Sequence, residues 1–424
     1  MRGFRAALVL AGVAGLLAVA GSGAAKGPAT TPLLGFVPTG QDSWSLARLN
    51  PLTLKPRRGR AMKLKDAIFA WSLSPDGSKL VTAAGGEVQG ELRLIDTARM
   101  RGSGRIVFAD QVQVLRTFWP EKQRLYAVVT HVSRRSDGNF DRQPASLVTI
   151  DPATRHVLGE RSLDGYLYGS AYAPNALGLV LGAETGIGPA RLAVVGADGG
   201  VTTIPLEGVT VGWEAFDPNN LEAGSHFAEV GLALSPDGTR AYVAAPGQLV
   251  AIDLRTRALS YHRLGPARRL QKGPVEGSSR SVQWARDGVL LVTGQDLRPR
   301  TSDTERIEIH AIAPQLVDTR DWSAQSLDST ATYASVGANA IALMGSSWND
   351  KLQRNVGCGV VLYGLDGVKR AHLFGTNNTY GFIVGRRAFI ARTGYSYAVV
   401  STTTGRVVRT VLRLLPTPLL PEFR

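Results

Sequence analysis

The feature that most constrains the fold of this 424-residue chain is a segment that occurs twice, as LSPDGSKLVTAA at 73–84 and as LSPDGTRAYVAA at 234–245. In both copies an apolar strand is followed by Ser-Pro-Asp-Gly and by a second apolar strand. Pro fixes φ at one turn position, Asp accepts hydrogen bonds within the turn, and Gly adopts a positive φ. The two copies therefore predict tight antiparallel hairpins in two distant parts of the chain.

Looser copies of a longer pattern surround these hairpins, with a third strand that ends in Asp, a second turn and a fourth strand. The second turn reads IDTARM, IDPATRHV and IDLRTRAL, and Asp151 and Asp253 are expected to accept backbone N–H bonds in it. Seven such segments begin near residues 69, 114, 168, 229, 280, 333 and 380. Four-stranded units that recur every ~40 to 60 residues predict an all-β protein, a β-propeller of four-stranded antiparallel blades.

The number of blades depends on the two ends of the propeller, which is expected over 32–413. Residues 32–64 match the last three strands of a blade and have no inner strand of their own. The C-terminal tail at 414–424 could supply that strand and close the ring, because closure leaves no open sheet edge. Eight blades are therefore favoured, and seven blades are the alternative.

Four segments carry a resemblance to a known family: Leu73–Gly77, Leu234–Gly238, and the third strands LRLID (92–96) and LVAID (249–253). With these segments the chain resembles exported bacterial propellers of the YVTN and WD40-like repeat class, and the propeller domain of the periplasmic Tol-system protein. The resemblance implies a propeller fold and an interaction role. It carries over no active residue, because it lies in the turns and strands of the repeat.

The N-terminus reads as an export signal over 1–25. Arg2 and Arg5 precede an apolar run that ends in small residues suited to cleavage. An uncleaved membrane anchor is the alternative, and no later segment is apolar enough to span a membrane. The expected location is therefore the periplasm, the cell envelope or the extracellular space.

The net charge indicates which partners to expect, and the cysteine content indicates whether a disulfide can form. The net charge is +14, and basic clusters occur at 55–65 and 263–272. A protein or an anionic envelope polymer is therefore a candidate partner, whereas nucleic acid is not expected for an exported chain. Cys358 is the only cysteine, which excludes an internal disulfide and indicates a core thiol. The protein is expected to be a monomer.

The insertion at 209–231 interrupts the repeat and is the main candidate for a binding site, because loops that leave a rigid scaffold often carry function. It could form a polar lid over the propeller channel that grips a cation or a sugar. Its candidate binding residues are Trp213, Glu214, Asp217, Asn219, Glu222 and His226.

A second candidate is a calcium loop in SDGNFDRQ, where Asp137, Asn139 and Asp141 stand at alternate positions. The pattern breaks at Arg142, where a calcium loop needs Gly, and no other cofactor is expected. The tryptophans Trp71, Trp119 and Trp284 are interpreted as core residues between blades.

Two functional hypotheses follow. The first is an exported non-catalytic propeller that binds a protein, a peptide or an envelope glycan. The alternative is a propeller enzyme of the glycan lyase, hydrolase or lactonase type, with its site at the channel mouth.

Overall fold

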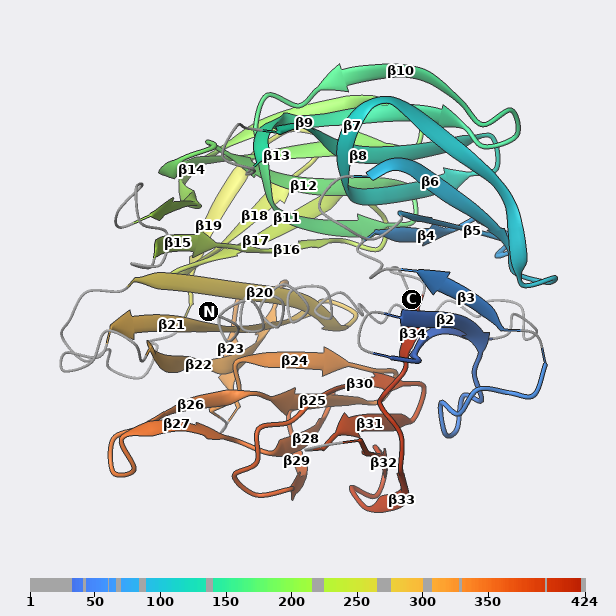
Figure 1. Ribbon diagram of the computed structural model, residues 1–424. Coiled ribbons are helices and arrows are strands. Elements are labelled where there is room, and N and C mark those ends of the chain that lie inside the picture. The colour runs from blue at the N-terminus through green and yellow to red at the C-terminus, as the bar shows by residue number, and fades with distance from the viewer. Residues whose placement is uncertain are drawn as a thin grey trace. The chain divides into compact units, whose positions relative to one another are not determined.

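The computed structural model contains strands and no helix within the residues that it describes, so the predicted all-β class is confirmed (Figure 1). No helix in this part of the chain is long and apolar enough to cross a membrane. The described residues are 33–40, 43–59, 61–65, 70–83, 89–134, 140–215, 225–264, 276–299, 307–327, 330–392 and 395–420.

The described chain divides into two compact units. The first unit consists of residues 33–212 together with 416–420, and the second consists of residues 213–415.

The first sheet of the first unit joins the two ends of the described chain. Its strand order is β34-β1-β2-β3, and β34 pairs antiparallel with β1 through three residues. The tail thus provides the strand that residues 32–64 lack. The strands are β1 (Leu34–Pro38), β2 (Ser43–Arg48), β3 (Met62–Lys65) and β34 (Thr417–Leu419).

The second sheet of the first unit has seven strands in the order β10-β9-β8-β7-β6-β5-β4. The long strand β7 belongs to two hairpins: its first half pairs with β6 and its second half pairs with β8. The strands are β4 (Trp71–Leu73), β5 (Lys79–Ala83), β6 (Gln89–Asp96), β7 (Arg101–Glu121), β8 (Arg124–Arg134), β9 (Phe140–Asp151) and β10 (His156–Ser162).

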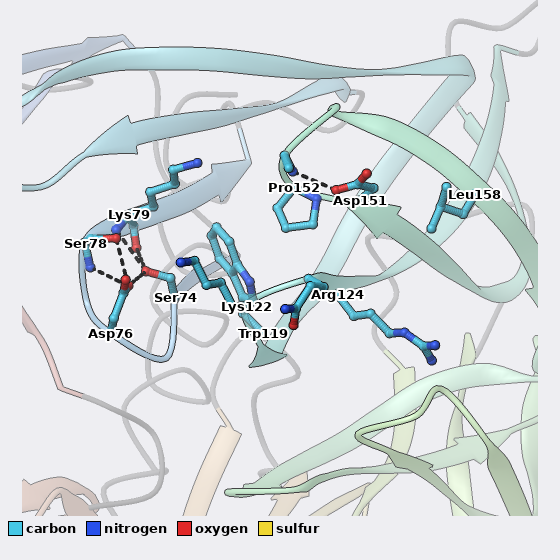
Figure 2. Close-up of a pocket in the computed structure, with 12 residues that line it drawn as sticks. Ser74, Asp76, Ser78, Lys79, Trp119, Lys122, Arg124, Asp151, Pro152 and Leu158 are labelled. Carbon is cyan, nitrogen blue, oxygen red and sulfur yellow. Dashed lines mark hydrogen bonds between the residues drawn. The ribbon is translucent and has the colours of Figure 1, made fainter.

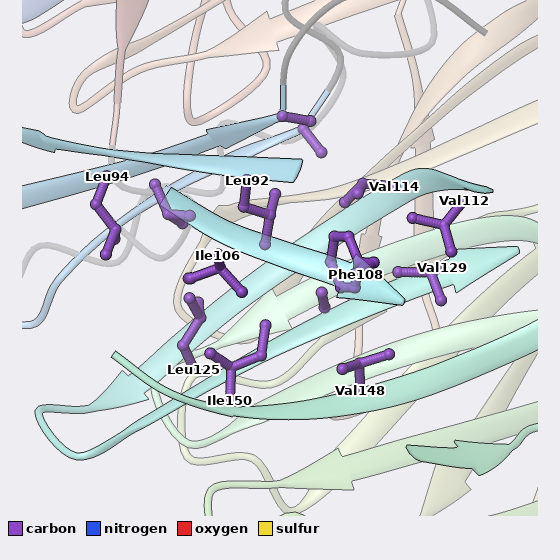
Figure 3. Close-up of a cluster of buried hydrophobic side chains, with 14 of the residues drawn as sticks. Leu92, Leu94, Ile106, Phe108, Val112, Val114, Leu125, Val129, Val148 and Ile150 are labelled. Carbon is purple, nitrogen blue, oxygen red and sulfur yellow. The ribbon is translucent and has the colours of Figure 1, made fainter. Parts of the chain in front are cut away.

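The apolar interior of this sheet lies between the two halves of β7 and their neighbours. Alternate side chains of β6 to β9, such as Leu92, Ile106 and Val129, meet there in one cluster (Figure 3). Because successive side chains in a strand point to opposite faces, the alternation buries one face of each strand. Trp119 belongs to the same cluster, as its interpretation as a core residue predicts.

Four further antiparallel strands follow in this unit, and they are neighbours in sequence order. The strands are β11 (Tyr166–Ala173), β12 (Ala176–Gly182), β13 (Gly186–Gly196) and β14 (Val201–Ala215).

In the second unit, one set of neighbouring strands runs β15-β20-β21-β22-β23, and β15 pairs parallel with β20. A separate four-stranded sheet has the order β16-β17-β18-β19. The strands are β15 (Ser225–Glu229), β16 (Gly231–Leu234), β17 (Arg240–Ala245), β18 (Gln248–Asp253), β19 (Leu259–Arg263), β20 (Gly277–Arg286), β21 (Val289–Pro299), β22 (Ile307–Asp318) and β23 (Ala324–Ser326).

The rest of the second unit contains two four-stranded sheets, ordered β24-β25-β28-β29 and β30-β31-β32-β33, and the hairpin β26-β27. Cys358 is buried in the apolar cluster beside β25 and β28, which confirms its interpretation as a core thiol. The strands are β24 (Tyr333–Val336), β25 (Ala340–Met344), β26 (Ser346–Asn349), β27 (Arg354–Gly357), β28 (Val360–Gly364), β29 (Lys369–Leu373), β30 (Tyr380–Val384), β31 (Arg387–Ala391), β32 (Tyr397–Ser401) and β33 (Val407–Val411).

Both LSPDG segments form the predicted turns. Gly77 and Gly238 have φ of 68° and 69°, in the left-handed region that favours glycine. The carboxylate of Asp76 accepts hydrogen bonds inside its turn, and Asp237 does the same in the second copy. The strands on either side of each turn pair antiparallel. The repeat therefore fixes the hairpin geometry.

Candidate functional site

A pocket of about 460 Å³ opens in the first unit where three hairpin turns meet (Figure 2). The first turn is the LSPDG turn between β4 and β5, the second joins β7 to β8, and the third joins β9 to β10. The lining residues are Ser74, Asp76, Ser78, Lys79, Trp119, Lys122, Gln123, Arg124, Asp151, Pro152, Ala153 and Leu158. Its volume is in the range of pockets that hold small ligands or single side chains of a partner.

The two carboxylates of the lining are occupied by their own turns. Oδ1 of Asp76 accepts hydrogen bonds from the Ser74 hydroxyl at 2.7 Å, the Ser78 amide at 3.0 Å and the Ser78 hydroxyl at 2.8 Å. These bonds, with that from Ser74 the strongest, lower the pKa of Asp76 to about 2. The carboxylate of Asp76 therefore caps its turn and stays ionised at neutral pH.

Asp151 is held in the same way. Its Oδ1 accepts a bond from the Ala153 amide at 2.8 Å, and its Oδ2 accepts one from the Thr154 hydroxyl at 2.7 Å. The Thr154 hydroxyl, followed by the Ala153 amide, lowers the pKa of Asp151. The predicted backbone bonds to Asp151 are thus confirmed, as are those to Asp253 from Arg255 and Thr256.

The indole of Trp119 lies between the Asp76 turn and Pro152 (Figure 2). Its residue is only 4% exposed, and its Nε1 has no hydrogen-bond partner among the described residues. A buried N–H without an acceptor is costly, because the group has lost its bonds to water. Trp119 is thus a lining residue whose buried N–H has no hydrogen-bond partner among the described residues.

The basic side chains of the lining differ in how they are engaged. Nη1 of Arg124 donates to the carbonyl oxygen of Asp198 at 2.6 Å, which ties this guanidinium to a neighbouring turn. Lys79 and Lys122 form no ion pair with any described residue, although the charge of Lys122 contributes to the low pKa of Asp76. Two ammonium groups are thus available for a ligand.

The residues predicted in the 209–231 insertion are only partly described. Trp213 and Glu214 are exposed near the end of β14, and His226 is half-buried in β15. Asp217, Asn219 and Glu222 lie outside the described residues. The polar lid therefore stays a prediction.

The calcium loop also stays a prediction. Asp137 and Asn139 lie outside the described residues, and Asp141 stands in β9 opposite Ser133 of β8. The export signal at 1–25 lies outside the described part of the chain as well.

Sequence reasoning missed the pocket because it treated each turn as a separate structural device. The signal that could have found it is the combination of a turn-capping Asp, a Trp in the next hairpin and basic residues directly after that Trp. Only the register of β7 and β8 shows that Trp119 and Lys122 come to the same place as the LSPDG turn.

Comparison with known proteins locates the fold but no family. No family model matches the sequence, and no curated protein matches it. Among solved structures, the chain is similar to dihydro-heme d1 dehydrogenase NirN in complex with DHE, with a TM-score of 0.56 and 11% identity, covering 93% of this chain and 76% of that one.

Two further similar structures have lower scores. The computationally designed Ika8 protein has a TM-score of 0.48 and 12% identity, covering 83% of this chain and 88% of that one. BamB from Moraxella catarrhalis has a TM-score of 0.47 and 12% identity, covering 81% and 88%. The likeness to NirN shows the fold alone, and the chain is an all-β protein with a β-propeller fold. Membership of the YVTN and WD40-like repeat class stays a prediction.

Proposed function

We propose that this protein is an exported, non-catalytic β-propeller that binds a protein, a peptide or an envelope glycan at the pocket formed by its turns. The observation that carries the proposal is the state of the pocket's polar groups. Both carboxylates accept hydrogen bonds from their own turns, whereas the buried Trp119 N–H and the ammonium groups of Lys79 and Lys122 have no partner among the described residues. Such a set can hold a ligand in place.

The same groups are poorly suited to acid–base catalysis. A general acid or base works best when its pKa lies near the working pH. Asp76 has a pKa of about 2, and that of Asp151 is also lowered, so both carry a charge that they do not exchange near neutral pH. None of the twelve described residues that line the pocket is a histidine or a cysteine. The arrangement thus favours binding over turnover.

The scaffold for this function is proposed to have eight blades. The support is that β7 can be divided between two four-stranded sets and that β34 adds the fourth strand to β1, β2 and β3. Export, to the periplasm or beyond, is supported by the N-terminal segment of the sequence with Arg2, Arg5 and the apolar run after them.

The test is a binding screen of the purified protein on peptide arrays and anionic-glycan arrays. Lys122→Glu reverses a charge in the pocket, and Lys351→Glu makes the same change at an exposed turn of the second unit. We expect ligands whose binding is lost with Lys122→Glu and kept with Lys351→Glu. If no ligand distinguishes the two variants, the pocket is not the binding site.

The enzyme alternative is tested in parallel. The wild-type protein is incubated with a panel of polysaccharides and lactones, and products are followed by reducing-end and acid-release assays. Turnover that disappears with Lys122→Glu, or with Glu214→Gln or His226→Gln, would replace the binding proposal with the enzyme hypothesis.

A further inference from the structure

The two copies of the LSPDG hairpin differ in what the next hairpin places against them. Trp119 stands two residues before Glu121, which is the last paired residue before the turn between β7 and β8. Trp284 likewise stands two residues before Arg286, the last paired residue before the turn between β20 and β21. The two tryptophans are therefore equivalent in register. Only one of them has a partner: Nε1 of Trp284 donates to the carbonyl oxygen of Leu234 at 2.5 Å.

Aromatic side chains fill the second copy. Tyr242 packs edge-on against Trp284 with ring centroids 5.4 Å apart, and Trp322 packs against both Tyr242 and His262. Tyr242 thus packs directly against the Trp284 indole, which stays partly exposed. The N–H of Trp284 therefore has its hydrogen-bond acceptor within the fold.

Among the described residues, the first copy has other side chains at the positions of two of these rings. Tyr242 of the second copy pairs with the residue just before Leu234, and the equivalent residue of the first copy is Val81, which pairs with the residue just before Leu73. A second pair of equivalent residues lies in the turn that follows the third strand of the next repeat. Trp322 has a positive φ there and its amide donates to the carbonyl oxygen of Asp318; Arg155 has a positive φ and its amide donates to the carbonyl oxygen of Asp151. Val81 and Arg155 therefore stand where the second copy has two aromatic rings, and the first copy has a pocket beside Trp119.

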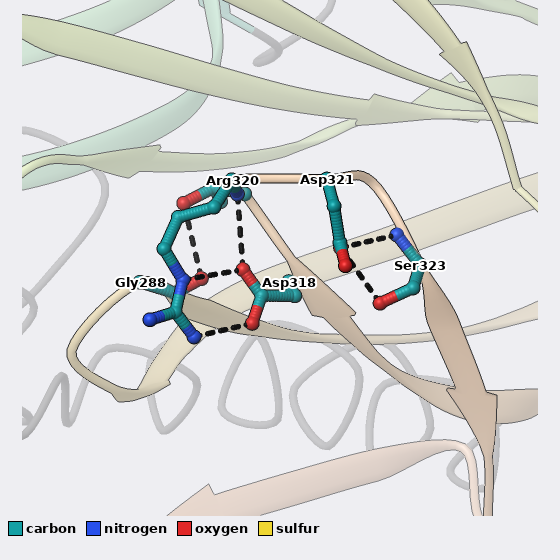
Figure 4. Close-up of polar contacts among 6 residues, drawn as sticks. Gly288, Asp318, Arg320, Asp321 and Ser323 are labelled. Carbon is teal, nitrogen blue, oxygen red and sulfur yellow. Dashed lines mark hydrogen bonds and ion pairs between the residues drawn. The ribbon is translucent and has the colours of Figure 1, made fainter.

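The charges of the two copies are also reversed. At the first copy the lining holds three basic residues and two acidic ones. The equivalent positions of the second copy hold two basic residues, Arg240 and Arg320, and three acidic ones. There Arg320 is neutralised by a two-pronged contact to Asp318, at 2.9 and 2.5 Å (Figure 4). An anion is therefore favoured at the first copy and not at the second.

The pocket also adjoins a strand that has only one neighbour among the described strands. Leu158 lines the pocket and belongs to β10, which is the terminal strand of its sheet and is exposed along its whole length. The outer N–H and C=O groups of a terminal strand can pair with an added strand. An extended peptide that pairs with β10 could place an acidic side chain in the pocket, whereas a glycan has no main chain to pair.

We propose that the pocket beside Trp119 binds the carboxylate of an acidic protein segment that extends along β10. The indole N–H and the ammonium groups of Lys79 and Lys122 receive the carboxylate, and the exposed edge of β10 receives the main chain. The inference rests on the proposed binding function and names its partner class.

The test uses fluorescence anisotropy with a labelled Val-Glu-Val-Glu-Val peptide and the full-length protein. We expect binding that is absent for a C-terminally amidated Val-Lys-Val-Lys-Val peptide and for a Val-Glu-Val-Glu-Val peptide N-methylated at alternate residues. The first lacks carboxylates, and the second lacks the main-chain donors along one edge. Trp119→Phe should weaken binding about tenfold or more, as loss of a hydrogen bond to a charged group predicts. The matched Trp284→Phe variant should bind as wild type.

Because misfolding of the Trp119 variant would also remove binding, a second variant changes the exposed residue Lys122. Lys122→Glu should abolish binding, whereas the control Lys351→Glu should not. Equal binding of the N-methylated peptide, or of Trp119→Phe and wild type, would overturn the inference. If a uronic acid polymer binds in a manner sensitive to Lys122→Glu and the acidic peptide does not bind, the inference is wrong and the proposed binding function stands. If no probe responds to Lys122→Glu, both are wrong.

Discussion

Removal of one partner of the buried ion pair between Arg280 and Asp296 is expected to destabilise the second unit strongly. The pair joins β20 to β21, its N–O distance is 2.9 Å, and both side chains are only 5% exposed. Arg280 also donates to the carbonyl oxygens of Ser279 and Gln295 at 3.0 and 2.9 Å. Burial disfavours the charge of Arg280 and lowers its pKa, although Asp296 opposes this effect.

The perturbation is Asp296→Asn, which preserves size and leaves the guanidinium buried without a counter-charge. Breaking a buried pair in this way costs about 3 to 5 kcal/mol of unfolding free energy. The double variant Arg280→Met/Asp296→Leu removes both charges and should cost much less, since a buried pair and an apolar replacement of similar volume are often nearly equal in stability.

The assay is urea unfolding followed by circular dichroism, with the unfolding free energy taken from the linear extrapolation. A matched control is Arg320→Met, which breaks an ion pair in which the Arg320 side chain is 70% exposed and should cost at most about 1 kcal/mol. The reasoning is refuted if Asp296→Asn costs no more than Arg320→Met, or if the double variant is less stable than Asp296→Asn.

Two further predictions concern the first unit. Leu419 of β34 is 2% exposed and packs in the core of the first sheet, so Leu419→Ala should lower the unfolding free energy by about 2 to 5 kcal/mol in urea unfolding. The control Leu412→Ala, at a residue that is 89% exposed, should change it by less than about 0.5 kcal/mol. Equal effects of the two variants would show that β34 adds no stability. The pKa of Asp76 lies at about 2, below its ordinary value of 3.8, so the stability that its ionised form contributes is fully present above pH 3.8 and is lost as the pH falls towards 2. Ser74→Ala should raise this pKa in an NMR titration and reduce the acid-induced loss, and Ser72→Ala, which removes a hydroxyl without a partner, should leave the titration unchanged.

The sequence alone determined the class of fold because turn chemistry and strand periodicity are local properties. Pro, Asp and Gly at fixed offsets set the LSPDG turns, and Gly77 and Asp76 adopt the conformation and the bonds that those residue types predict. The recurrence of four apolar strands required neighbouring sheets to pack together, and the likeness to a propeller structure agrees with this. The tail strand was also predictable, because residues 32–64 have three strands where the other repeats have four.

The tertiary structure alone decided where a site could form. The sequence directed attention to the insertion at 209–231, whereas the described pocket lies among three turns that obey the repeat. Trp119 and Trp284 occupy the same position in their hairpins, so local pattern cannot distinguish them. They differ in their partners in space: Trp284 donates to the carbonyl oxygen of Leu234 and packs against Tyr242, whereas Nε1 of Trp119 has no partner among the described residues and a pocket lies beside that residue. A pocket depends on which side chains of separate hairpins meet in space, and no periodicity along the chain records that meeting.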